Sequence, residues 1–143
     1  MTKVDFYLLP EQASQSRELL ACRLAEKAFH KQHHIYIHAA SLDQATRLDD
    51  LLWTFNQGSF LPHDLVTPDK AATTVITIGY QDAPAIKYDV MINLSEAIPP
   101  FFSRFTRVAE VVDPAPDSRK EARERYRFYR DRGYALDTHE LKS

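Results

Sequence analysis

Short apolar runs alternate with amphipathic stretches along this chain, and their periods predict a succession of strands and helices. Residues 3–9 are rich in β-forming side chains and stop at Pro10, which predicts a strand. Apolar side chains then recur on one stripe of a helix that extends to about residue 29, behind an N-cap at Ser14 or Ser16. The same criteria predict strands over 34–39, 75–79, 89–94 and 107–112, helices over 41–53 and 117–132, and a short helix at 101–102.

The order of these elements predicts an α/β fold. They follow one another as β-α-β-α-β-β-α-β-α, and alternation of this kind builds a mainly parallel sheet with helices on both faces. We therefore expect a single domain over residues 1–143, with a three-layer α/β/α, Rossmann-like architecture. Its C-terminal helix should end at Gly133, which can adopt the left-handed backbone needed there. Residues 54–73 have no period and are predicted as a long loop.

Composition excludes several classes of protein. The three glycines of the 143 residues lie too far apart for a dinucleotide fingerprint or a P-loop, so glycine-cradled nucleotide binding is excluded. The single cysteine, Cys22, excludes a disulfide framework and any paired-cysteine zinc or redox motif. The N-terminus lacks the regions of a signal peptide, and no apolar run approaches the ~20 residues of a membrane span. We therefore expect a cytoplasmic protein with no membrane partner.

Two groups of side chains are candidates for metal binding or catalysis, and neither has the spacing that such chemistry requires. Four histidines cluster in the sequence, namely His30, His33, His34 and His38. No acid or cysteine with motif spacing completes a ligand set, so a half-exposed polar strand face is the simpler interpretation. Acid pairs such as Asp49/Asp50 and Asp64/Asp69 arise by chance in a chain with 27% charged residues. We predict no catalytic activity, no metal site and no cofactor.

The most informative feature is the charge of the predicted last helix. The whole chain carries −2, yet residues 119–132 carry +4 and the remainder carries −6. Four arginines with helical spacing share one face, namely Arg119, Arg123, Arg127 and Arg130. Ala122, Tyr126 and Tyr129 form an adjoining apolar edge. Such a face suits an acidic peptide with an apolar anchor or the phosphates of nucleic acid. A solvated helix with ion pairs such as Glu121–Arg125 is the remaining interpretation.

A second candidate surface lies in the predicted loop. Phe60, Leu61 and Leu65 surround Pro62 soon after Trp53, at the end of the preceding helix. Apolar side chains on a loop either pack beneath it or form a protein interface, and the pattern leaves both interpretations open.

Several segments resemble one protein family, in order and over nearly the whole chain. Residues 122–130 (Ala-Arg-Glu-Arg-Tyr-Arg-Phe-Tyr-Arg) are similar to the C-terminal helix of the bacterial DNA polymerase III chi subunit. The similarity extends to the opening strand, the first two helices and the central loop, over residues 6–9, 20–29, 47–53 and 59–65. Residues 66–88 and those after Gly133 match poorly.

The resemblance implies a non-catalytic accessory subunit of the replicative polymerase's clamp loader. Members pair one-to-one with the psi subunit and bind the acidic C-terminal tail of single-stranded DNA-binding protein, which ends in Ile-Pro-Phe, so their contact with DNA is indirect. The implied tail-binding residues are Arg119, Arg123, Tyr126, Arg127 and Arg130. The implied psi-binding residues are Trp53, Phe60, Leu61, Pro62 and His63. The alternative function is an α/β module that binds nucleic acid directly through the basic C-terminal helix.

Overall fold

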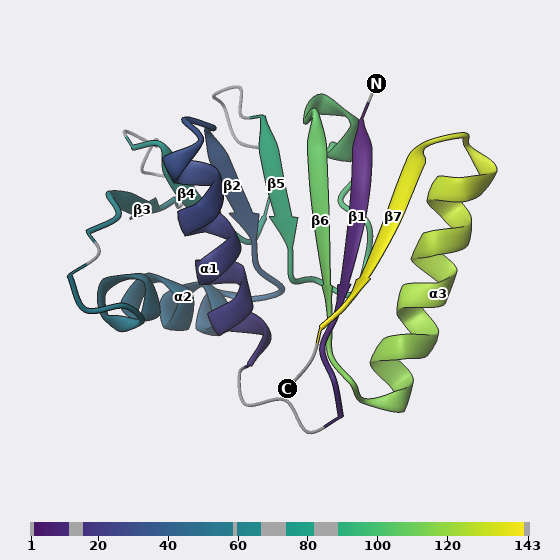
Figure 1. Cartoon of the computed structure of the whole chain (residues 1–143), viewed down its shortest axis with the longest axis horizontal. Coiled ribbons are helices and arrows are strands. Elements are labelled where there is room, and N and C mark those ends of the chain that lie inside the picture. The colour runs from purple at the N-terminus through teal and green to yellow at the C-terminus, as the bar shows by residue number, and fades with distance from the viewer. Residues whose placement is uncertain (1, 12–15, 59, 67–73, 82–88, 142–143) are drawn as a thin grey trace.

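The protein folds around a seven-stranded sheet with helices on both faces (Figure 1). The computed structural model describes residues 2–11, 16–58, 60–66, 74–81 and 89–141. The strands are β1 (Lys3–Leu8), β2 (Ile35–His38), β3 (His63–Leu65), β4 (Ile76–Gly79), β5 (Val90–Asn93), β6 (Arg107–Val112) and β7 (Ala135–Glu140). The helices are α1 (Arg17–His30), α2 (Leu42–Thr54) and α3 (Pro116–Asp131), with a 3₁₀ turn η1 (Phe102–Arg104).

The position of each strand in the sheet explains why some strands consist of consecutive apolar residues. The strands lie in the order β3-β4-β2-β5-β6-β1-β7, and each strand pairing in the described ranges is parallel. Strands β2, β4 and β5 lie inside the sheet and are buried on both faces, as parallel strands between helical layers usually are. The predicted α/β class and its mainly parallel sheet are confirmed.

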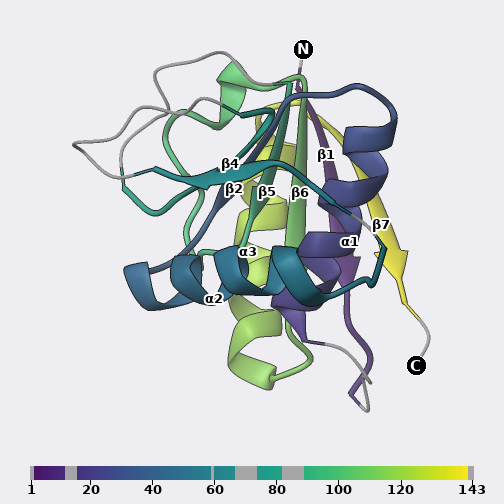
Figure 2. The same cartoon turned by 90° about the vertical axis from the view of Figure 1, so that its left-hand side faces the viewer.

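Two apolar cores separate the three layers. One core joins α1 and α2 to one face of the sheet, through side chains such as Leu20, Ala25 and Leu48. The other core joins α3 and η1 to the opposite face, where Tyr129 packs against both Phe6 and Phe102. Figure 2 shows α1 and α3 on opposite sides of the strands, and α2 shares the core of α1.

The helix ends follow the predicted capping residues. The Ser16 and Ser41 hydroxyls accept hydrogen bonds from the backbone N–H groups of Leu19 and Gln44, as N-caps do. Ser14, the other candidate, lies outside the described residues. Gly133 follows α3 with a φ of +81°, so the expected left-handed residue at this C-terminus is confirmed. No helix in the described part is both long and apolar enough to cross a bilayer.

Two strands were missing from the prediction. The predicted loop over 54–73 contains β3, which pairs with β4 although its sequence is only His-Asp-Leu. The chain also continues beyond α3 into β7, which pairs with β1 along six residues from Lys3↔Ala135 to Leu8↔Glu140. Strand β7 has no apolar run by which it could be predicted, because four of its six residues are polar and five of the six are exposed. Pro84, which the sequence places in a turn between the predicted strands over 75–79 and 89–94, lies outside the described residues.

Candidate functional site

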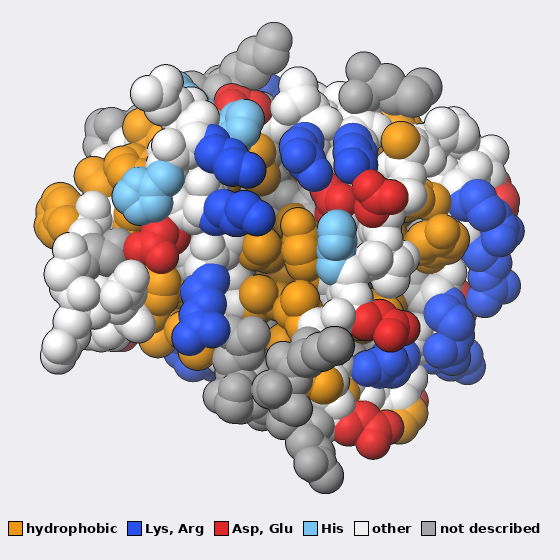
Figure 3. Space-filling model, viewed as in Figure 1, with side chains coloured by type: hydrophobic (Ala, Val, Ile, Leu, Met, Phe, Trp, Pro, Cys, Tyr) orange, Lys and Arg blue, Asp and Glu red, His pale blue; other side chains and the backbone are white. Residues whose placement is uncertain are grey.

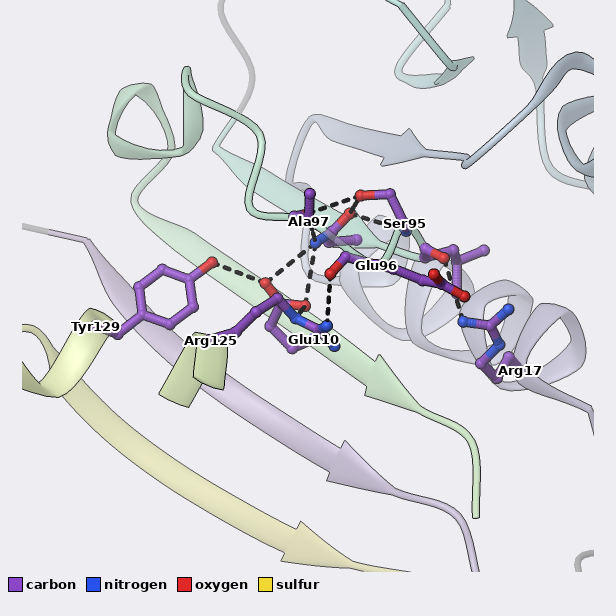
Figure 4. Close-up of polar contacts among 9 residues, drawn as sticks. Arg17, Ser95, Glu96, Ala97, Glu110, Arg125 and Tyr129 are labelled. Atoms are coloured by element: carbon purple, nitrogen blue, oxygen red, sulfur yellow. Dashed lines mark hydrogen bonds and ion pairs between the residues drawn. The ribbon is translucent and has the colours of Figure 1, made fainter. Parts of the chain in front are cut away.

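A buried polar network fixes the rotation of α3 on the sheet (Figure 4). Glu110 of β6 is fully buried and accepts hydrogen bonds from Arg125 Nε at 3.1 Å and from the Tyr129 hydroxyl at 2.7 Å. The Asn93 amide donates to both carboxylate oxygens at 3.1 Å. Arg125 also donates to the Glu96 carbonyl at 2.9 Å. Burial raises the pKa of Glu110, and the Arg125 guanidinium opposes that rise.

This network corrects two expectations about α3. Arg125 pairs with buried Glu110 of β6 beneath the helix, so the alternative of a solvated helix with a surface pair Glu121–Arg125 does not hold for this arginine. Tyr129, predicted on the apolar edge beside the arginines, is fully buried and belongs to the core. Because Arg125 and Tyr129 point inward, Arg123, Arg127 and Arg130 are turned outward and exposed, while Arg119 is half-buried at the edge of the helix.

An apolar cavity of about 250 Å³ lies between the N-terminal half of α3 and the sheet. Its lining residues are Phe6, Leu8, Val112, Arg119, Ala122, Arg123, Tyr126 and Thr138. The Tyr126 ring packs against Phe6 with 5.5 Å between ring centroids. The cavity therefore combines an apolar floor from β1 and β6 with two guanidinium groups from α3.

The two arginines of this cavity differ in their surroundings. Arg123 is exposed. Arg119 is half-buried, and its Nη2 donates to the Leu9 carbonyl at 2.9 Å. Among the buried side-chain nitrogen and oxygen atoms of the described residues, only Arg119 Nε lacks a hydrogen-bond partner. An orphaned donor beside an apolar cavity indicates a place for an acceptor from a ligand.

The cavity collects three of the five residues that the resemblance placed at the tail-binding site: Arg119, Arg123 and Tyr126. Arg127 and Arg130 are exposed and lie outside its lining, and Arg130 forms an ion pair with Asp131 at 3.2 Å. Sequence reasoning missed Phe6, Leu8 and Val112, which were recognised only as strand residues. The sequence shows that side chains alternate between the two faces of β1 and β6, but it does not show which of these faces packs against α3.

A second candidate surface lies at the C-terminal end of α2. Trp53 is 49% exposed and Phe60 is 70% exposed, and their ring centroids lie 5.3 Å apart. The Trp53 ring also packs on His63 at 4.3 Å. Two large exposed aromatic side chains in contact form a patch of the kind that marks protein interfaces.

Neighbours of this aromatic pair support it from beneath. Leu61 and His63 are buried, and Pro62 is half-buried. The two ring nitrogens of His63 lie 2.7 Å from the Leu61 carbonyl and 3.0 Å from the Asp49 carbonyl, which fixes the ring under Trp53. Both interpretations of the loop therefore hold in part, because Leu61 packs beneath it while Phe60 faces outward.

The histidine cluster is dispersed in the structure. His33 pairs with Asp89 at 2.8 Å, whereas His38 contacts the Tyr36 hydroxyl at 3.1 Å. Tyr36 and His38 are buried in the inner strand β2, so the expected half-exposed strand face is wrong. Within the described ranges, no three His, Cys, Asp or Glu side chains gather where they could hold a metal ion. Asp69 lies outside those ranges.

Comparison with known proteins gives the family of the chain. A family model described as DNA polymerase III chi subunit, HolC, matches residues 1–137. The DNA polymerase III subunit chi of Pseudomonas aeruginosa is 41% identical over 141 residues, which cover 99% of this chain and 98% of the relative. The proteins of the same name from Escherichia coli and Haemophilus influenzae are 32% and 31% identical, and at least 94% of each chain is covered. The chain belongs to the DNA polymerase III chi subunit family.

Proposed function

We propose that this chain is a non-catalytic adaptor that binds the psi subunit of the clamp loader and the acidic C-terminal tail of single-stranded DNA-binding protein. Membership of the chi family already makes it a component of DNA polymerase III that serves replication. The observation that carries the proposal is the apolar cavity of α3 with Arg119 and Arg123 in its lining.

The chemistry of the cavity supports a peptide that ends in an apolar residue and a carboxylate. The floor of Phe6, Leu8 and Val112 suits the terminal aromatic side chain. Arginine forks bind carboxylates through paired hydrogen bonds, and Arg119 Nε is a donor without an acceptor. The terminal Phe would thus enter the cavity while its carboxylate meets Arg119 and Arg123.

The charge of α3 supports recognition of the acidic residues that precede this anchor. Residues 119–132 carry +4, and the exposed Arg127 and Arg130 extend the positive surface beyond the cavity. Attraction between exposed charges is screened over about 8 Å at physiological ionic strength. Tail binding should therefore weaken as salt is added.

The test of the tail site is calorimetry with a tail peptide ending in Ile-Pro-Phe. The variant Arg123→Ala should weaken binding roughly tenfold to a hundredfold, because a hydrogen bond to a charged group contributes about 1.5–3 kcal/mol. Removal of the final Phe from the peptide should have a comparable effect, since burying such a side chain contributes about 1.5–3 kcal/mol.

The matched control is Arg132→Ala, since Arg132 lies at the C-terminal end of α3 over the Phe128 ring and outside the cavity. This variant should bind like the unmodified chain. Unchanged affinity in Arg123→Ala, or an equal loss in both variants, would contradict the assignment of the cavity.

The aromatic pair Trp53 and Phe60 supports the psi interface. Phe60 is the most exposed of the three large apolar side chains that are exposed in the described part of the chain. We expect Phe60→Ala to reduce co-purification of psi, whereas Leu42→Ala, at the other end of α2, should leave it unchanged. Leu42 is 47% exposed and so controls for the loss of any exposed apolar side chain. Wild-type recovery of psi with Phe60→Ala would refute this interface.

A further inference from the structure

A second hollow lies on the face of the sheet opposite α3. In the described part of the chain, α1 and α2 cover this face only as far as β6, and no helix covers β1 and β7 there (Figures 1 and 2). A cavity of about 130 Å³ opens between α1 and strands β1, β5 and β6. Figure 3 shows apolar side chains in the centre of this face, with lysine and arginine side chains above and to the left of them and acidic and histidine side chains to the right.

The free positive charges of this hollow are lysines. Lys27 of α1 and Lys31, the residue that follows this helix, line it, and both are exposed. Neither forms an ion pair with any side chain in the described ranges. Arg107 also lines the hollow, but its guanidinium already holds Asp5 at 2.7 Å. The lining thus holds three permanent cations and one carboxylate, with two cations available to a ligand.

Flat aromatic surface lies beside these charges. Tyr7 lines the hollow and stacks on His139 of β7, with 4.7 Å between ring centroids and 16° between planes. Both rings are partly exposed, and the buried side chains of Ile92 and Ala109 form the apolar floor of the hollow next to them. Cations beside a stacked aromatic pair suit a ligand in which negative charge alternates with flat rings.

These observations favour nucleic acid over an acidic peptide. Carboxylates are recognised best by free arginine forks, and the arginine of this hollow is occupied by Asp5. A lysine acts as a compact point charge that needs no paired geometry, which suits a phosphate. Proteins that bind single strands combine such charges with aromatic side chains on which bases stack. We propose that this hollow, on the face opposite the tail cavity, binds single-stranded DNA.

The proposal is tested by fluorescence anisotropy of a labelled oligothymidylate at low salt, using the full chain. The double variant Lys27→Ala/Lys31→Ala should weaken binding. It should also reduce the slope of log affinity against log salt by roughly 1.4, since each phosphate contact to a single strand contributes about 0.7. Tyr7→Leu should weaken binding roughly fivefold or more through the loss of base stacking.

Two controls separate this site from the basic helix. Lys120→Ala removes an exposed lysine from α3 and should leave DNA binding unchanged. The double lysine variant should bind the tail peptide like the unmodified chain, so a failure of the DNA site is distinguishable from a failure of the tail cavity. The proposal is overturned if the unmodified chain binds no oligothymidylate at low salt. It is equally overturned if Lys120→Ala or Arg123→Ala weakens DNA binding as much as the double variant does.

Discussion

Adjacent residues in the loop after α2 have opposite roles, as Phe60 and Leu61 show. Phe60 is 70% exposed, whereas Leu61 is 1% exposed and packs in the core beneath α2. Leu61→Ala should therefore lower the free energy of unfolding by about 2–5 kcal/mol, because it leaves a cavity. Phe60→Ala should change it by about 0.5 kcal/mol or less. Urea denaturation of both variants measures the difference, and equal losses would contradict the assigned burial.

The thiol of Cys22 illustrates how burial controls reactivity at a single residue. Burial raises the pKa of Cys22 to about 12, and the nearby Glu18 carboxylate adds to the rise. The thiolate is the reactive form, so at pH 8 only about one thiol in ten thousand is ionised. We expect a disulfide reagent such as Ellman's reagent to label the folded chain very slowly and the guanidinium-unfolded chain at once. Rapid labelling of the folded chain would show that α1 opens readily.

At the scale of elements, α3 is held on the sheet by the pair Glu110–Arg125. Arg125→Met would leave a buried carboxylate without its counter-charge, which costs about 3–5 kcal/mol in comparable cases. We expect a loss of this size in the free energy of unfolding. The double variant Glu110→Gln/Arg125→Met should recover part of it, because the charge is then removed on both sides. If the double variant is no more stable than the single one, charge is not what couples α3 to β6.

Helix α3 also shows how far sequence reasoning reaches. Its extent, its end at Gly133 and the spacing of Arg119, Arg123 and Tyr126 were predictable, because each depends on local periodicity. The inward role of Arg125 was not assigned, although it falls between Ala122 and Tyr129 on the apolar stripe. Its partner, Glu110, is the only charged residue inside the apolar part of β6, which is a second signal that the two belong together.

The periodicity of apolar residues does not predict the two missed strands. Strands β3 and β7 lie at the two edges of the sheet, where half of the surface meets solvent and apolar runs are not needed. The floor of the α3 cavity was missed for a related reason. Which face of β1 meets α3 depends on the sheet order, and that order is set by contacts between residues more than one hundred positions apart.

At the scale of the whole molecule, Asp5 joins three strands at one end of the sheet. It accepts hydrogen bonds from Arg107 of β6 at 2.7 Å and from His139 of β7 at 3.0 Å. Burial raises the pKa of Asp5, but the hydrogen bonds from Arg107 and His139 outweigh it and hold the pKa below its usual value. A carboxyl group with a lowered pKa stabilises the fold above its unfolded pKa, and this stability is lost as the pH falls through the folded value.

This arrangement predicts the acid sensitivity of the fold. Asp5→Asn should cost about 1–3 kcal/mol of unfolding free energy at pH 7. The difference from the unmodified chain should persist to about pH 5 and shrink below about pH 4. Denaturation curves between pH 7 and pH 3 measure it, with Asp137→Asn as the control, because Asp137 is exposed and pairs only with Lys3 in the described part. A difference that is independent of pH would contradict this role.

The order of the strands has a consequence for how the two proposed protein sites act together. Trp53 and Phe60 lie beside β3, whereas the α3 cavity is centred on β1, roughly 24 Å away across five strand spacings. The two sites share no residue, so we expect a coupling free energy near zero between psi and the tail peptide. Calorimetry should then give one tail affinity with or without psi. In that case the chain would work as a spacer, raising the effective concentration of one partner near the other without altering either affinity.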